Sequence, residues 1–304
     1  MRAMGRISHY IKEVGRGKDG ARALTREQAA DCFGQLLDGQ VSDLETGAFC
    51  IAMRVKGETP DEMAGFLDAT AARMQSVPAG DRPLVVLPSY NGARRLPVLT
   101  PLLALLLARE GLPVALHGTP TENRAVTAAE VLAALGTAPA QAVAPVEAGQ
   151  VAFLPTGLLC PGLQRLLEVR RTIGLRNPAH SLVKLMNISE GPAVRVGSYT
   201  HPEYAVSMGQ IFALVSATAL LLRGTEGESV ADPRRLPAME GFVRGQRVTL
   251  EAGQRGSLTE LPSLPSALDA ASTAAYTRDV LAGRLPVPTS LQVQVEHILR
   301  LACA

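Results

Sequence analysis

The chain has 304 residues, enough to bury the core of one large domain and one small domain. Hydrophobic residues make up 47% of the sequence and charged residues 19%, the balance of an ordinary globular protein. The net charge of +2 indicates no particular partner, and because Trp is absent and aromatic residues are only 4%, an aromatic stacking platform for single-stranded nucleic acid is not expected.

The cysteines and the apolar segments indicate the cellular compartment of the protein. No two cysteines form a C-x-x-C pair, which favours buried free thiols in a reducing environment. The first six residues lack the apolar region of a secretory signal. Residues 205–222 are the most apolar window, but polar residues interrupt it, so it predicts a buried helix rather than a membrane span. We therefore expect a cytoplasmic protein. The cysteines are Cys32, Cys50, Cys160 and Cys303.

The first 80 residues predict a small helical domain. Residues 1–22 are rich in Arg and Lys and are expected to form a solvated basic arm, with phosphate contact as the alternative. Three helix starts follow. Thr25 with Gln28, and Ser42 with Glu45, have the spacing of capping boxes, and Thr59-Pro60 places proline at the first position of a third helix.

From residue 84 onward, apolar strands alternate with helices, which predicts an α/β domain with a mainly parallel sheet and helices on both sides. We expect domains over 1–80 and 81–304, the second being able to return a helix to the first. Residues 231–264 predict short antiparallel strands. The expected strands cover 84–87, 114–118, 151–155, 194–199 and 219–223, and the expected helices 96–108, 128–135, 163–171 and 291–302.

Two polar loops, 88–95 and 117–124, follow the first two expected strands. In open α/β sheets ligands bind at the carboxyl ends of the strands, where loop amides and helix N-termini meet anions. These loops are therefore the expected place of a small-molecule pocket. Within them, His117 is expected to be a hydrogen-bonded turn residue rather than a catalyst, because no carboxylate partner is evident nearby.

These loops and the segment 52–65 resemble the anthranilate phosphoribosyltransferases of glycosyltransferase family 3. That family follows the two strands with Gly-Thr-Gly-Gly-Asp and Lys-His-Gly-Asn-Arg, where this chain has residues 89–93 and a stretched loop, 117–124. The resemblance implies a homodimer whose hinge and dimer interface involve the helices around 52–65. It also implies a vestigial substrate pocket formed by Ser89, Asn91, Gly92, Thr100, His117, Gly118, Asn123 and Arg124.

The groups that hold diphosphate and Mg²⁺ in that family are altered here. Only Gly92 remains in the first loop, although glycines are what let several backbone amides approach a diphosphate. Ser229 and Val230 stand where the family has its Asp-Glu metal ligands, and neither side chain can replace a carboxylate for Mg²⁺. Glu226 and Glu228 are interpreted as surface or capping carboxylates, or as metal ligands after a loop shift. We expect no catalytic residue, metal or cofactor, with Mg²⁺ and phosphoribosyl pyrophosphate as the alternative.

Basic residues gather between 161 and 200, against only two acidic ones. Arg176 falls where the family places the arginine that contacts the aromatic carboxylate. A contiguous positive groove would neutralise a phosphate backbone without reading its sequence, whereas a scattered basic surface would not. Adding the pair in the first loop, the candidate phosphate-binding residues are Arg94, Arg95, Arg165, Arg170, Arg171, Arg176, Lys184 and Arg195.

The motifs at 88–95, 175–181, 198–204 and 223–228 together resemble the YbiB branch of this superfamily. That resemblance implies the transferase fold, a homodimer and nucleic-acid binding with low sequence specificity. Our hypothesis is therefore a homodimer that binds DNA or RNA non-specifically and does not contact membranes. Two alternatives stay open: a phosphoribosyl- or phosphorylase-type transferase with an altered substrate, and a regulatory module that senses a small anionic metabolite.

Overall fold

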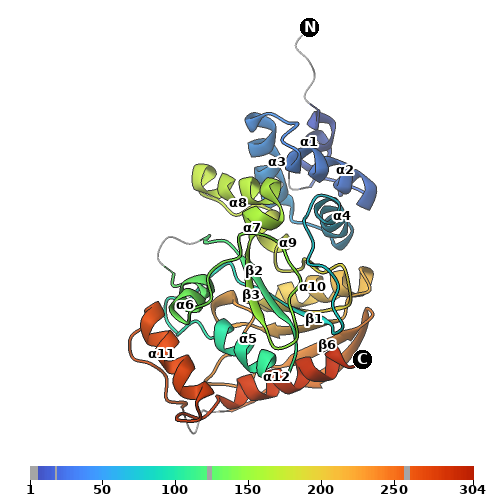
Figure 1. Ribbon diagram of the computed structural model, residues 1–304. Helices are drawn as coiled ribbons and strands as arrows, with labels where there is room; N and C mark the ends of the chain where they lie inside the picture. The colour runs from blue at the N-terminus through green and yellow to red at the C-terminus, as the bar shows by residue number, and fades with distance from the viewer. Residues whose placement is uncertain (1–5, 18, 122–124, 257–260) are drawn as a thin grey trace. The chain divides into compact units, whose positions relative to one another are not determined.

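The computed structural model describes residues 6–17, 19–121, 125–256 and 261–304, and the chain divides into two compact units. We call residues 1–75 and 156–188 the helical unit, and residues 76–155 and 189–304 the sheet unit. The division at residue 75 lies near the boundary expected at 80. The chain returns to the helical unit with a segment of three helices, where a single helix was anticipated (Figure 1).

The helical unit begins with a short helix that the sequence did not predict. It covers Ser8–Val14 within the stretch expected to be a solvated arm, and Ile7 and Val14 are buried. These two apolar side chains explain why the arm is folded, since the helix packs on α3. The helices of this unit are α1 (Ser8–Val14), α2 (Arg26–Leu37), α3 (Asp43–Lys56), α4 (Pro60–Ala71), α7 (Thr156–Leu159), α8 (Pro161–Ile173) and α9 (Ala179–Leu182).

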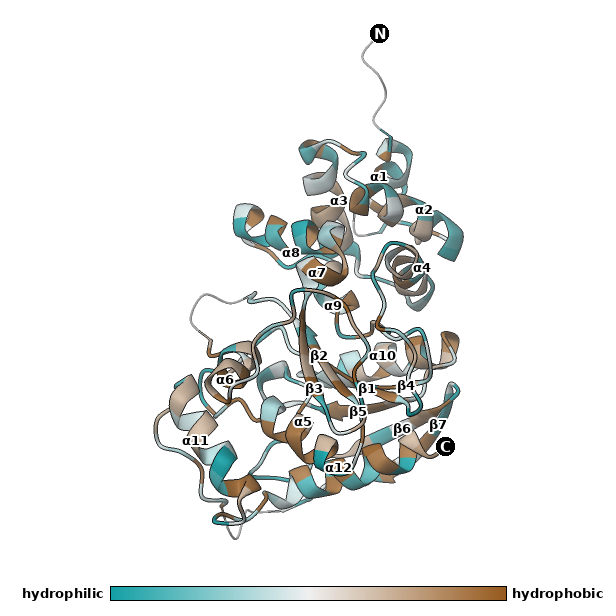
Figure 2. Ribbon diagram, viewed as in Figure 1, coloured by the Kyte–Doolittle hydropathy of each residue, from teal (hydrophilic) through white to brown (hydrophobic). Residues whose placement is uncertain are grey.

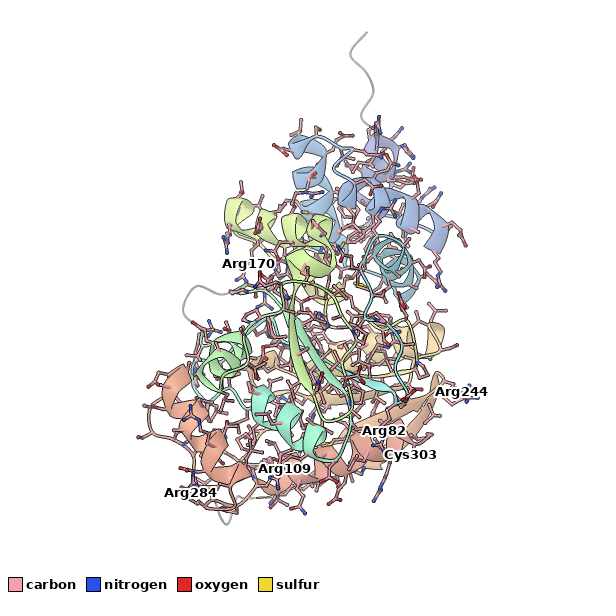
Figure 3. The ribbon with its side chains drawn as sticks, in the orientation of Figure 1. Arg82, Arg109, Arg170, Arg244, Arg284 and Cys303 are labelled. Carbon is pink, nitrogen blue, oxygen red and sulfur yellow. The ribbon has the colours of Figure 1, made fainter. Side chains whose placement is uncertain are left out.

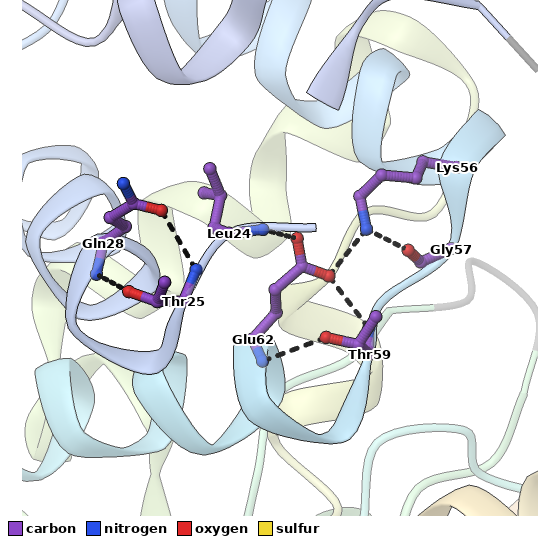
Figure 4. Close-up of polar contacts among 7 residues, drawn as sticks. All are labelled: Leu24, Thr25, Gln28, Lys56, Gly57, Thr59 and Glu62. Carbon is purple, nitrogen blue, oxygen red and sulfur yellow. Dashed lines mark hydrogen bonds and ion pairs between the residues drawn. The ribbon is translucent and has the colours of Figure 1, made fainter. Parts of the chain in front are cut away.

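Capping boxes begin α2, α3 and α4, which confirms the helix starts expected from the sequence. At α4 the capping residue does more than close its own helix. Glu62 is fully buried, accepts the backbone amides of Thr59 and Leu24 at 2.9 Å each, and pairs with Lys56 at 2.6 Å (Figure 4). This carboxylate therefore ties the starts of α2 and α4 to the end of α3.

An aromatic cluster forms the core of the helical unit. The Phe33 and Phe66 rings stack with centroids 4.6 Å apart, and Phe49 meets Phe66 edge-on at 6.1 Å. Gly65 lets α2 and α4 approach closely, because a Cβ atom there would lie 2.2 Å from the carbonyl oxygen of Arg26. The bundle thus depends on a helix contact that only glycine permits.

The sheet unit contains one seven-stranded sheet with the order β3-β2-β1-β4-β5-β6-β7. The first five strands are parallel, and β6 and β7 are antiparallel. This confirms the mainly parallel sheet and the short antiparallel strands expected over 231–264. Ribbons of the central strands are apolar along most of their length (Figure 2). The strands are β1 (Leu84–Pro88), β2 (Val114–Gly118), β3 (Val151–Pro155), β4 (Ala193–Tyr199), β5 (Ala219–Arg223), β6 (Met239–Val243) and β7 (Gln246–Glu251).

Helices cover both faces of this sheet. On β4, Val194 and Val196 belong to the apolar core shared with α5 (Thr100–Arg109), α6 (Ala128–Ala134), α11 (Ala270–Leu281) and α12 (Thr289–Ala302). The alternate residues of β4 face the other way: Gly197 lies against the ring of Phe212 in α10 (Pro202–Leu214). The expected fold class, an α/β sheet with helices on both sides and a helical N-terminal domain, is confirmed.

The cysteines agree with the free thiols expected. Cys32, Cys50 and Cys160 are buried and Cys303 is exposed, and all four are unbridged. Burial raises the pKa of the Cys50 thiol to about 12, so this thiol stays protonated at neutral pH. Within the described parts of the chain, no helix is long and apolar enough to cross a membrane.

Candidate functional site

Three loops of the sheet unit leave the carboxyl ends of parallel strands. They follow β1, β2 and β5, and β4 lies between β1 and β5 in the sheet. We call residues 89–96 the first loop and residues 224–231 the third loop. The side chains of the third loop reach past the end of β4 and contact the first loop directly.

Glu228 is the centre of this contact. Its side chain is 1% exposed, and its carboxylate accepts hydrogen bonds from the Ser89 hydroxyl at 2.6 Å and the Gly92 amide at 2.9 Å. The Asn91 amide donates at 3.0 Å and the Thr100 hydroxyl at 3.1 Å. Four residues of the expected vestigial pocket, Ser89, Asn91, Gly92 and Thr100, are therefore brought together around a carboxylate of the same chain.

Glu226, in the third loop, contacts the second half of the first loop. Its carboxylate accepts the backbone amides of Arg94 at 3.1 Å, Arg95 at 2.8 Å and Leu96 at 3.1 Å. Glu226 itself has φ 51° and ψ 22°, the left-handed conformation that non-glycine residues rarely adopt. Arg94 and Arg95 thus contribute their backbone amides here, while both residues are exposed.

Other hydrogen bonds fix the third loop on the sheet. The Ser198 hydroxyl donates to the Gly227 carbonyl at 2.9 Å, and the Ser229 hydroxyl donates to the Pro88 carbonyl at 3.0 Å. On the other side, the amide group of Gln294 in α12 donates to the Ser229 carbonyl at 3.0 Å. Ser229, at the position of a family metal ligand, therefore has a structural role.

His117 is fully buried near the end of β2, inside the strand expected over 114–118, and does not lie in a turn. Its Nδ1 atom lies 2.8 Å from the Tyr90 hydroxyl, and burial lowers the pKa of the ring to about 3. Among the described residues, none hydrogen-bonds its Nε2 atom. The imidazole is therefore neutral at pH 7, enclosed and in hydrogen-bond contact with a phenol.

A small cavity of about 210 Å³ lies between the first loop and residues 118–120, at and just after the end of β2. Gly118 lines it together with Ser89, Gly92 and apolar side chains such as Phe153. Gly118 is required for this geometry, since a Cβ atom there would lie 1.9 Å from the Ser89 carbonyl oxygen. Asn123 and Arg124, the remaining pocket residues expected from the sequence, lie outside the described residues.

The candidate phosphate-binding residues divide between the two units. Five of them belong to the helical unit, on α8 and the segment after it: Arg165, Arg170, Arg171, Arg176 and Lys184. Arg165, Arg171 and Arg176 are exposed, and Arg165 donates to the Leu37 carbonyl at 2.8 Å. Arg94, Arg95 and Arg195 belong to the sheet unit.

Arg195 differs from the other candidates. Its guanidinium lies 5.6 Å from the centre of the Phe212 ring, and burial lowers its pKa to about 10. A guanidinium covered in this way packs against α10, so Arg195 does not belong with the exposed arginines expected to meet phosphate.

Glu226 and Glu228 were not among the site residues expected from the sequence, although they join the third loop to the first loop. A signal was present in the two carboxylates spaced two residues apart directly after a buried strand. Their partners, however, lie more than 125 residues earlier in the chain, so only the folded sheet reveals the contact.

A helical bundle joined to a mainly parallel sheet with these strand-end loops defines a protein of the phosphoribosyltransferase type of fold. A solved anthranilate phosphoribosyltransferase from Thermus thermophilus matches this structure with a TM-score of 0.71 at 21% identity, covering 97% of this chain and 99% of that one. The family model described as glycosyl transferase family, helical bundle domain, matches residues 8–74.

Sequence relatives agree with this assignment. The uncharacterized protein YbiB of Escherichia coli K12 is 41% identical over 293 residues, which cover 94% of this chain and 91% of that protein. An anthranilate phosphoribosyltransferase of Methylocella silvestris is 29% identical over 86% of this chain and 77% of that enzyme. The chain belongs to the anthranilate phosphoribosyltransferase-like superfamily, glycosyltransferase family 3.

The residues at the expected metal position do not fit Mg²⁺. Magnesium needs oxygen ligands that are open to it, usually carboxylates together with substrate phosphates and water. Here Glu226 and Glu228 already accept seven donors, which come from the first loop and from Thr100. In the described part of the chain, no three His, Cys, Asp or Glu side chains are grouped so as to hold a metal ion. The sequence favoured surface or capping carboxylates, whereas Glu228 is buried and both glutamates accept hydrogen bonds from the first loop.

Proposed function

We propose that this protein binds nucleic acid, DNA or RNA, without sequence preference, through the basic residues of the helical unit. The observation that carries the proposal is the charge of the segment 156–188, which contains five Arg and Lys residues and a single carboxylate, Glu168. A cluster of exposed cations neutralises phosphates and releases counterions, and this interaction does not depend on base sequence.

The same unit contains matched charges elsewhere, so the excess on this segment is local. Arg26 pairs with Asp68 at 2.6 Å, and Arg73 pairs with Asp38 at 2.7 Å. These pairs join α2 to α4 and to the residues just after it, whereas Glu168 is the only acidic residue between 156 and 188. The segment therefore carries an excess of positive charge in its own sequence, which favours contact with phosphates.

The amphipathic pattern of α8 supports this use. Leu163, Leu166 and Leu167 are buried and fix the helix on its unit, and the exposed positions include Arg165 and Arg171. Polar and apolar segments of α8 are distinct in Figure 2, and Arg170 projects from the ribbon of α8 in Figure 3. A helix held by its leucines presents its cations on a rigid surface, which lowers the entropy lost on binding.

The contacts of the first loop weigh against transfer of a phosphoribosyl group. An enzyme of this superfamily would need the amides of this loop for a diphosphate, and in this chain Glu226 and Glu228 accept them. The exposed arginines of the helical unit require no such loop to bind a phosphate backbone. Nucleic-acid binding is thus the function that the residues of this chain support best.

We also propose that the protein is a homodimer formed through α3. Leu44, Ile51 and Val55 are 83%, 38% and 67% exposed and recur at helical spacing on this helix. Ile51 and Val55 also line a cavity of about 580 Å³ between α1 and α3. A stripe of large apolar side chains on the surface is unfavourable in water, so a second copy that covers it would stabilise the protein. The superfamily resemblance implies a dimer interface that involves the helices around 52–65, which include the end of α3.

The proposal is tested by fluorescence anisotropy with several labelled oligonucleotides of equal length and unrelated sequence. We expect them to bind with similar affinity at low salt. In parallel, phosphoribosyl pyrophosphate with Mg²⁺ is added in a thermal-shift assay, where we expect no stabilisation. Absence of oligonucleotide binding at low salt, together with Mg²⁺-dependent stabilisation by the sugar phosphate, would overturn the proposal and favour a transferase.

A further inference from the structure

The first loop is built like an anion-binding loop, and its donors are already engaged. Five backbone amides, those of Asn91, Gly92, Arg94, Arg95 and Leu96, donate to carboxylate oxygens. Successive main-chain amides that converge on one point form the anion-binding concavity found in many phosphate sites. What differs here is the source of the anion, because both carboxylates belong to the third loop of the same chain.

The backbone of both loops is shaped for this contact. Gly92, whose amide donates to Glu228, has φ 61°, and Glu226 has a left-handed conformation that is unfavourable for a residue with a side chain. The Asn91 side chain in turn donates to the Glu226 carbonyl at 3.0 Å. A strained residue held by partners on both sides indicates that the contact is built into the fold.

The two glutamates could serve only to stiffen the loops, or they could occupy an anion-binding site. The charge of the acceptor distinguishes these two roles. A neutral acceptor would satisfy the same amides, whereas a carboxylate supplies the negative charge that convergent amides favour. Two such carboxylates, separated by one residue, also match a ligand with two linked anionic groups. The exposed Arg94 and Arg95 lie in the same loop and add positive charge beside it.

We propose that the first loop is an anion-binding site whose resident anions are the carboxylates of Glu226 and Glu228, so that inorganic phosphate or pyrophosphate binds there only when a carboxylate is removed. The two carboxylates act as a built-in competitor. Because they are part of the chain, a free anion must displace them from within the fold, at a high effective concentration. This inference does not depend on nucleic-acid binding, which we assign to the other unit.

The variant Glu226→Ala tests the proposal, because Glu226 is only half-buried and water can reach the amides it vacates. Glu240→Ala is the matched control: it removes one carboxylate from the same unit, and Glu240 pairs with Arg247 rather than with the first loop. Inorganic pyrophosphate is titrated into each full-length protein by calorimetry, without metal. We expect pyrophosphate to bind Glu226→Ala at least about tenfold more tightly than the wild type or Glu240→Ala.

Equal affinity of all three proteins for pyrophosphate, or tighter binding by the wild type, would overturn the proposal. A second measurement needs no variant. In the wild type, hydrogen exchange should show the amides of Gly92, Arg95 and Leu96 to be protected, and pyrophosphate should leave that protection unchanged. Exchange of these amides at the rate of an open loop would equally refute the proposal, whether or not Glu226→Ala folds.

Discussion

The backbone amide of Gly92 donates to the carboxylate of Glu228 over 2.9 Å, although the two residues are 136 positions apart in the chain. Gly92 is the one glycine left in the loop that holds diphosphate in the enzymes this chain resembles. In this chain the anion that accepts the Gly92 amide is a carboxylate of the protein itself. The first three predictions follow from this region of the sheet unit.

Replacing Glu228 by alanine should destabilise the protein strongly. The change leaves the Ser89 and Thr100 hydroxyls and two amides without their buried acceptor. We expect the free energy of unfolding to fall by about 3 kcal/mol, and by less for Glu228→Gln, which keeps an acceptor oxygen. Urea denaturation measures both values. A loss below about 0.5 kcal/mol for the alanine variant would mean that the contact contributes little.

Gly92→Ala should cost more stability than Gly136→Ala. Both glycines have positive φ, 61° and 94°, so each substitution places alanine in an unfavourable conformation, at about 1 kcal/mol. Only at Gly92 would the new Cβ atom also meet a fixed group, the Val126 carbonyl oxygen at 2.4 Å, whereas nothing lies within 4 Å at Gly136. We expect a difference of about 2 kcal/mol in the free energy of unfolding. Equal losses would argue against the close loop packing described here.

His117 should make the stability of the protein depend on pH. Burial lowers its folded pKa to about 3, against about 6.5 in the unfolded chain. Between these values the unfolded state binds more protons, so the free energy of unfolding decreases as the pH falls, by up to about 1.4 kcal/mol per pH unit. His117→Gln removes this contribution.

Denaturation of both proteins between pH 7 and pH 5 measures the effect. The stability of the wild type should fall more steeply than that of His117→Gln. The same slope in both proteins would mean that the imidazole binds its proton as readily in the folded state as in the unfolded chain, in disagreement with its enclosed position next to Tyr90.

Charge placed on the exposed stripe of α3 should separate the proposed dimer. We expect Leu44→Glu/Val55→Glu to elute at the mass of one chain in size-exclusion chromatography with light scattering, and the wild type at twice that mass. Both side chains are largely exposed in the single chain, so the folded protomer should tolerate the changes. A wild-type protein that remains a monomer at micromolar concentration would exclude this interface.

Local patterns in the sequence predicted much of the fold. The helix starts at Thr25 and Ser42 were correct because a capping box needs only residues three positions apart. The parallel and antiparallel parts of the sheet followed from the spacing of apolar runs and turn residues. The helix Ser8–Val14 was missed because it is held by its packing on α3, where Val14 is buried, and such a contact has no local signature.

The candidate site was less predictable. The sequence placed Ser89, Asn91, Gly92 and Thr100 in one pocket by resemblance, but it did not show that Glu228 occupies their donors. Arg195 was grouped with surface arginines because its place on the face of β4 covered by Phe212 depends on the packing of α10. The acceptor role of Glu228 and the position of Arg195 both depend on contacts between distant segments, so only the folded chain reveals them.

The most direct test of nucleic-acid binding is the salt dependence of affinity for one labelled oligonucleotide. We compare the wild type with Arg170→Ala/Arg171→Ala in α8 and with Arg244→Ala/Arg300→Ala, a control that removes the same charge from exposed positions of the sheet unit. The wild type and the control should lose affinity steeply with salt. The α8 variant should bind at least about tenfold more weakly, with a shallower slope of log K against log salt. Equal affinities and slopes for the two variants would contradict the assignment of nucleic-acid binding to α8.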